Sequence, residues 1–97
     1  MSTPLSQSEI NEVLESLPGW QQDGDRLVKT FVFNHFPEAI SFIVRIGFIA
    51  EKLNHHPELT NVYNRVGIAL TTHDAGNRVT ERDVALARAI QGFSWVA

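Results

Sequence analysis

The stretch that decides the fold is residues 51–74, EKLNHHPELTNVYNRVGIALTTHD. Its His56-Pro57 step ends a helical pattern, because the residue before a proline is pushed out of the α region. Two runs that follow, ELTNVYN and GIALTTH, predict strands joined near residues 65–67. Alternate side chains of the second run share a face, with Ile68, Leu70 and Thr72 on one side and Ala69, Thr71 and His73 on the other. The stretch therefore predicts a helix end, a loop and an antiparallel hairpin.

A capping box and a stop signal predict a helix before this stretch. Ser6 and Glu9 have the spacing at which each side chain can bond the backbone of the other, and Pro18-Gly19 ends the helix that they begin. Residues 19–33 then predict a first hairpin, which turns at the DGD run of residues 23–25.

Two further helices complete the predicted order of elements. One is expected over residues 37–53, and the last begins after the cap residue Thr80. The order is α-β-β-α-β-β-α within one domain, residues 1–97. Two hairpins with the helices gathered on one side predict an α+β fold, in which a four-stranded antiparallel sheet carries helices on one face.

The predicted helix over residues 37–53 is apolar around well over half of its circumference. Its polar positions are few: Glu38, Ser41, Arg45 and Lys52. Ile43, Gly47 and Ala50 suit the side that packs on the sheet. Either Phe42 and Ile49, or Val44 and Phe48, are then left without a partner inside the chain. Because such patches usually mark an interface, this helix predicts a homodimer or a dimer of dimers.

Composition narrows the class of protein. The chain has 97 residues and a formal net charge of −3, which counts against nucleic-acid binding as its main role. It has no cysteine, so it forms no disulfide and no thiolate metal site. Its start resembles no signal peptide, and no apolar stretch approaches the roughly 20 residues needed to cross a bilayer. These features predict a cytoplasmic protein with no membrane contact.

Three of the four histidines fall within the same stretch. His55 and His56 lie in the loop after the second helix, and His73 lies at the end of the last predicted strand. Histidine both donates and accepts a proton near neutrality, since its unperturbed pKa is about 6.5. Several histidines around one pocket therefore predict a proton transfer that needs an acid and a base.

The spacing Glu51-x3-His55-His56-Pro57-x5-Tyr63-x9-His73-x9-Asp83 resembles the signature of the pterin-4a-carbinolamine dehydratases. Gly19-Trp20, NVYN, TTH and ERD extend this resemblance over nearly the whole chain. The resemblance implies dehydration of 4a-hydroxytetrahydrobiopterin to quinonoid dihydropterin in tetrahydrobiopterin recycling. It implies no metal and no organic cofactor, and an aromatic amino acid hydroxylase as a partner in the pathway.

The resemblance also implies roles for single residues. Water leaves C4a while a proton leaves N5, and the acid/base set for these steps would be His55, His56 and His73. The same three histidines would contact the pterin together with Asn54, Thr71, Thr72 and Asp74. Many relatives are expected to carry Asp where Asn54 stands and Glu where Asp74 stands. Glu51 and Asp83 are expected to orient the histidines without contacting the substrate themselves.

Several of these residues have a plainer interpretation. His55 could satisfy the last carbonyls of a helix, and Asp83 could be a helix cap together with Thr80.

Three histidines near Asp74 could also bind a metal, although adjacent side chains on extended backbone diverge and reach one ion with difficulty. Glu51 falls inside the apolar arc of its helix, where a buried carboxylate would need a partner. Trp20 and Tyr63 are expected in the core rather than against a pterin ring.

A different class of function also fits the sequence. The same fold could serve as a non-catalytic interaction module, a coactivator or an assembly factor, because a fold alone does not fix a function. The complete set of histidines favours catalysis, since a binding module has no need of it.

Overall fold

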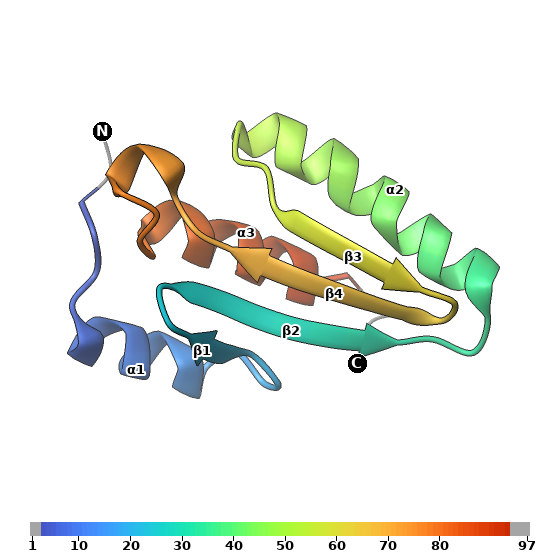
Figure 1. Cartoon of the computed structure of the whole chain (residues 1–97), viewed down its shortest axis with the longest axis horizontal. Helices are drawn as coiled ribbons and strands as arrows, with labels where there is room; N and C mark the ends of the chain where they lie inside the picture. The colour runs from blue at the N-terminus through green and yellow to red at the C-terminus, as the bar shows by residue number, and fades with distance from the viewer. Residues whose placement is uncertain (1–2, 94–97) are drawn as a thin grey trace.

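The computed structural model describes residues 3–93, which form a four-stranded antiparallel sheet with three α-helices (Figure 1). The order of elements is α-β-β-α-β-β-α, as the sequence predicts. The elements are α1 Gln7–Glu15, β1 Gln21–Asp23, β2 Arg26–Val32, α2 Phe36–Leu53, β3 Glu58–Val62, β4 Arg65–Leu70 and α3 Glu81–Gln91. A short 3-10 helix, η1 His73–Ala75, lies between β4 and α3.

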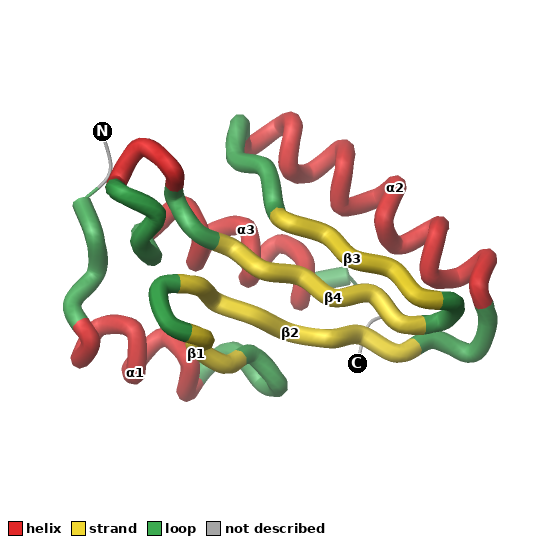
Figure 2. The backbone as a smooth tube through the Cα atoms, viewed as in Figure 1, coloured by secondary structure: helices red, strands yellow, loops and turns green. Residues whose placement is uncertain are grey.

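The strands lie in the order β1-β2-β4-β3, so the last strand of the chain lies inside the sheet (Figure 2). β4 pairs with β2 and with β3, and Ile68 stands opposite Lys29 on one side and Leu59 on the other. The predicted alternation holds, because Ile68, Leu70 and Thr72 are buried while His73 on the opposite phase is exposed. The end of β4 is therefore held on both sides before the chain reaches the histidine.

The turn of the second hairpin lies two residues earlier than the sequence predicts. Arg65 already pairs with Val62, and the turn is Tyr63-Asn64. The side chain of Asn61 closes it by donating to the carbonyls of Tyr63 and Arg65, at 3.2 and 2.9 Å. Gly67 suggested a turn, but it is a strand residue whose added Cβ would stand 2.5 Å from the hydroxyl of Thr60.

One face of the sheet carries α2 and α3, while α1 lies beside β1 (Figure 1). The apolar side chains of the sheet and of these helices meet in one core, whose larger members are Leu27, Phe31, Phe42, Ile46, Val66, Ile68, Leu70, Leu86 and Ile90. Ile10 of α1 and Trp20 join the same core. This burial fixes the two helices whose ends approach the histidines.

The buried side of α2 is rotated from the predicted side, of which only Ala50 is buried. Ala39, Phe42, Ile46 and Ala50 are buried, whereas Ile43 is half-buried and Gly47 is exposed. The large ring of Phe42 determines which side of α2 is buried, because it packs against Phe31 and Phe33 with ring centroids 4.8 and 5.0 Å apart. Of the two alternatives, Val44 and Phe48 are the pair without cover from residues 3–93, with 54% and 75% of each exposed.

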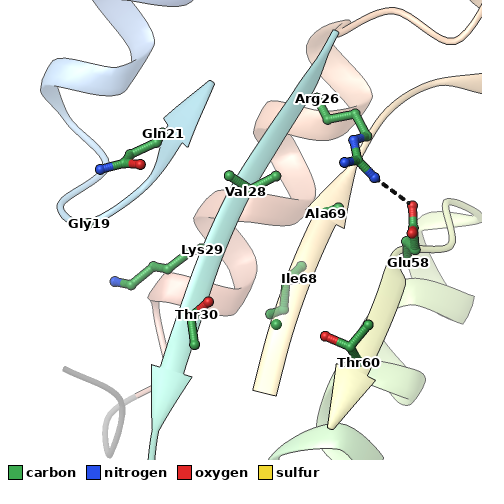
Figure 3. Close-up of a pocket in the computed structure, with 11 residues that line it drawn as sticks. Gly19, Gln21, Arg26, Val28, Lys29, Thr30, Glu58, Thr60, Ile68 and Ala69 are labelled. Atoms are coloured by element: carbon green, nitrogen blue, oxygen red, sulfur yellow. Dashed lines mark hydrogen bonds and ion pairs between the residues drawn. The ribbon is translucent and has the colours of Figure 1, made fainter. Parts of the chain in front are cut away.

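The other face of the sheet is open and slightly hollow. Figure 3 shows its floor of small side chains, among them Thr30, Thr60 and Ala69. Arg26 of β2 reaches across β4 to Glu58 of β3, with 3.0 Å between guanidinium and carboxylate (Figure 3). The hollow has a volume of about 450 Å³, and its lining includes none of the histidines.

Candidate active site

A small polar cavity of about 230 Å³ lies where the end of α2, the end of β4 and the start of α3 meet. Its lining is Asn54, His55, His56, Thr71, Thr72, His73, Asp74 and Arg82. Every residue predicted to contact a pterin is in this set. Residues 54–56 and 71–74 are far apart in sequence, and the fold brings them together.

The end of α2 presents the first of these segments. Asn54 has φ 50° and ψ 45°, a left-handed conformation that Asn tolerates better than most residues. The backbone N–H of His55 donates to the carbonyl of Ala50 at 3.0 Å, and that of Asn54 donates to Glu51 at 3.1 Å. These two bonds form a Schellman motif, which ends the helix and turns the chain toward β3.

His55 is buried and contacts a buried carboxylate. Its Nε2 lies 2.5 Å from Oδ1 of Asp83, and only 7% of His55 and none of Asp83 is exposed. The second oxygen of Asp83 accepts from the hydroxyl of Thr72 at 2.8 Å and from the backbone N–H of Thr80 at 2.9 Å. Both carboxylate oxygens thus serve as acceptors. For a neutral His55 beside an ionised Asp83, this contact requires the ring proton on Nε2 and leaves the lone pair on Nδ1.

Asp83 fills both of the roles predicted for it, as a helix cap and as a partner of a histidine. It is the third residue of α3 and forms a capping box with Thr80. It also holds His55, and the hydroxyls of Thr72 and Thr80 lie 2.7 Å apart beside it. A cap that is itself fully buried joins the start of α3 to β4 and to the end of α2.

His56 contacts a different carboxylate in a different environment. Its Nε2 lies 3.0 Å from Oε1 of Glu51, and these side chains are 64% and 82% exposed. The expectation that Glu51 lies buried is wrong for this chain. Glu51 falls between Ile40 and Val44 around α2, and that side of the helix is uncovered within residues 3–93. The expected partner of Glu51 is nevertheless present.

His73 has a neutral partner. It is exposed, begins η1, and its Nδ1 lies 3.2 Å from Oδ1 of Asn77. Asn77 and Gly76 both have positive φ, and residues 72 and 78 form an isolated bridge that closes this loop. Each of the three histidines therefore contacts one side-chain oxygen through one ring nitrogen, and the three oxygens differ in charge and burial.

The structure also tests the plainer interpretations. Trp20 is a core residue, with its ring centroid 6.2 Å from that of Phe31. Tyr63 is not in the core, because it lies in the turn between β3 and β4 and is 62% exposed. Within residues 3–93 there is no group of three His, Asp or Glu side chains arranged to hold a metal ion. In the same part of the chain no helix has the length and apolar character of a bilayer span.

Sequence reasoning missed Arg82. This residue lines the cavity, and its Nη2 donates to the carbonyl of Asn54. Its place directly before Asp83, within the ERD run that the family resemblance includes, was the available signal.

The chain is similar to known proteins over nearly its whole length. The family model described as "Pterin 4 alpha carbinolamine dehydratase" matches residues 3–93. A protein of Opitutus terrae that carries the name of a pterin-4-alpha-carbinolamine dehydratase is 54% identical over 96 residues, covering 99% of each chain. A protein of the same name from Thermomicrobium roseum is 50% identical over 84 residues, covering 87% of this chain and 89% of its own.

A solved structure is also similar over most of its length. It is described as a transcriptional coactivator/pterin dehydratase from Brucella melitensis, and it superposes with a TM-score of 0.87 at 42% identity. The match covers 92% of this chain and 96% of the other.

Proposed function

The chain belongs to the pterin 4 alpha carbinolamine dehydratase family of hydro-lyases, and we propose that it dehydrates 4a-hydroxytetrahydrobiopterin to quinonoid dihydropterin and water. The observation that carries this proposal is the meeting of His55, His56 and His73 in one polar cavity. In the cell the reaction would support tetrahydrobiopterin recycling, in the cytoplasm, beside an aromatic amino acid hydroxylase.

The three histidines form the acid/base set of the proposed reaction. The hydroxyl on C4a must leave as water, so it needs a proton, and the proton on N5 must be removed. His55 suits the base, because Asp83 holds its proton on Nε2 and leaves Nδ1 able to accept. His56 and His73 are the exposed histidines and suit the donation of a proton to the leaving hydroxyl.

The remaining lining residues support binding of the pterin ring. Asn54, Thr71 and Asp74 offer an amide, a hydroxyl and a carboxylate to its polar edges. Thr72 contributes differently, because its hydroxyl is already engaged with Asp83 and Thr80. We therefore assign Thr72 the support of Asp83 rather than a side-chain contact with the substrate.

The proposed mechanism needs neither a metal nor an organic cofactor. His55 and His56 contact different carboxylates, which supports separate roles for them rather than a shared ion. Exhaustive chelation should leave the dehydration rate unchanged.

The proposal includes self-association through α2, as a homodimer or a dimer of dimers. Phe48, Val44 and Ile40 are 75%, 54% and 38% exposed along one side of that helix. Gly47 lies on the same side, and a Cβ added there would meet nothing within 4 Å. A glycine inside a helix costs roughly 0.5–1 kcal/mol relative to alanine, and close approach of another copy would account for it.

A second candidate function is an interaction module. The similar structure from Brucella melitensis is described as a transcriptional coactivator as well as a pterin dehydratase. The open face of the sheet (Figure 3) offers a surface for such a role, separate from the histidines.

One experiment tests the main proposal. Stopped-flow absorbance follows quinonoid dihydropterin forming from 4a-hydroxytetrahydropterin, with unmodified protein, His56→Ala and His73→Ala. Each replacement should lower the rate at least tenfold while the fold is kept, since positioned acid/base groups contribute about 10²–10⁴. His35→Ala is the matched control, because His35 caps α2 at its other end. Wild-type rates in both test variants would contradict the proposed site.

A further inference from the structure

The first turn of α3 holds the end of α2 through two neighbouring residues. Arg82 donates from Nη2 to the carbonyl of Asn54, and Asp83 contacts Nε2 of His55. The two contacted residues are also neighbours. Arg82 therefore fixes the peptide plane between Asn54 and His55, while Asp83 fixes the imidazole ring of His55.

That peptide plane sets the direction of the histidine loop. The bonds that end α2 use the backbone N–H groups of Asn54 and His55, and they leave the carbonyl of Asn54 outside the helix. Without a partner this carbonyl could turn about the flanking backbone bonds. Such a turn would move His55 and His56 together, because both follow it directly in the chain.

An arginine at position 82 is not explained by a contribution to the stability of α3. A cation in the first turn of a helix is opposed by the positive end of the macrodipole. Among residues 3–93 Arg82 makes no ion pair with a carboxylate within 4.0 Å, and its side chain reaches the carbonyl of Asn54 instead. A hydrogen bond with a charged donor is about twice as strong as a neutral one, which suits it to hold a loop.

We propose that Arg82 is a positioning residue. Together with Asp83 it clamps the Asn54–His55 peptide, and so determines how His55 and His56 face the cavity. Its role in catalysis rests on the proposed dehydratase function, whereas its effect on the ring of His55 does not.

The kinetic test compares variants of two arginines on α3. Arg82→Met keeps the apolar stem and removes every donor, and Arg82→Lys keeps one donor for the carbonyl. Arg88→Ala is the control, because Arg88 also makes one side-chain hydrogen bond from α3, to the hydroxyl of Ser16 at 3.0 Å. We expect kcat to fall by about 10–100-fold in Arg82→Met with KM changed less, as misplacement of reacting groups does. Arg82→Lys should recover most of the rate, and Arg88→Ala should keep it.

A second readout works without catalysis. Imidazole nitrogen NMR of the full chain should show His55 with its proton on Nε2, and Arg82→Met should lose that single form while circular dichroism shows the fold intact. Arg82→Leu, which also has no donor, replaces Arg82→Met if the latter does not fold. A wild-type His55 spectrum in the folded variant overturns the clamp, and so does a wild-type kcat where the protein is active. If the unmodified protein dehydrates no pterin, the proposed function fails and the spectrum alone decides the clamp.

Discussion

At the scale of single residues, the three histidines of the cavity differ in what each of them contacts. His55 has a buried carboxylate, His56 an exposed one and His73 a neutral amide. A buried carboxylate whose two oxygens both accept hydrogen bonds holds a ring firmly. An exposed ion pair, by contrast, contributes only about 0–1 kcal/mol to stability. The structure therefore separates three residues that look equivalent in the sequence.

Asp83→Asn should disturb the site more than its similar size suggests. An amide offers one acceptor oxygen where the carboxylate offers two, so it cannot bond His55 and the donors of Thr72 and Thr80 as before. We expect the dehydration rate to fall by about 10²-fold or more, since a wrong imidazole tautomer has costs of that order or larger. Stopped-flow kinetics measure it. Glu81→Gln, an exposed carboxylate in the same turn, is the control. A variant with the wild-type rate would contradict the orienting role of Asp83.

Glu51→Ala should lower the dehydration rate more than Lys52→Ala. Glu51 contacts His56 at 3.0 Å, while Lys52 is an exposed neighbour on the same helix. Because the Glu51 pair is exposed, its loss should leave the melting temperature almost unchanged. The same assay and a thermal melt separate the two effects. Equal and negligible changes in rate would make Glu51 an ordinary surface residue.

At the scale of elements, periodicity and cap residues predicted the order of the helices and strands and the buried face of the sheet. The predicted buried side of α2 was largely wrong. Alternation in β4 identifies a buried face because its large apolar side chains, Val66, Ile68 and Leu70, all belong to one phase. The apolar arc of α2 is too wide for that, and the packing of Phe42 against Phe31 and Phe33 decides the side that is buried. The prediction that Glu51 is buried was wrong for the same reason. The hairpin turn was misplaced because Gly67 serves a close contact inside a strand.

The cap of α1 gives a pH-dependent prediction. Hydrogen bonds from the backbone and side chain of Ser6 lower the pKa of Glu9 from its usual 4.5. A folded-state pKa below the unfolded value means that the cap stabilises the fold above pH 4.5 and loses this effect as pH falls through the lowered pKa. Glu9→Gln should therefore melt at a lower temperature than the unmodified protein at pH 7. The difference should close in strong acid. Glu12→Gln, exposed on the same helix, is the control.

At the scale of the whole molecule, the sequence predicted which residues meet but not how they are held. Asn54, His55, His56, Thr71, Thr72, His73 and Asp74 do line one cavity. Family spacing made that prediction, because segments 54–56 and 71–74 carry no local sign of each other. The bond from Arg82 to the carbonyl of Asn54 could not be foreseen, since a backbone acceptor leaves no mark in the sequence.

Self-association is the prediction that belongs to this scale. Phe48→Glu should shift the protein toward monomer, because burying an unpaired carboxylate at an interface is costly. Analytical ultracentrifugation measures it. Val32→Glu is the control, since Val32 is 60% exposed and belongs to the phase of β2 opposite to the buried Phe31. A monomer at micromolar concentration in the unmodified protein would contradict assembly through α2.

The buried carboxylate of Asp83 has a consequence for folding kinetics. It joins Thr72, eleven positions away in the chain, and His55, twenty-eight positions away. Contacts between segments separated in sequence require loop closure before they can form. The complete set of three histidines is therefore in place only after α2, β4 and α3 have docked. Enzymatic activity during refolding should thus recover with the last increase in tertiary structure, after helix content has returned.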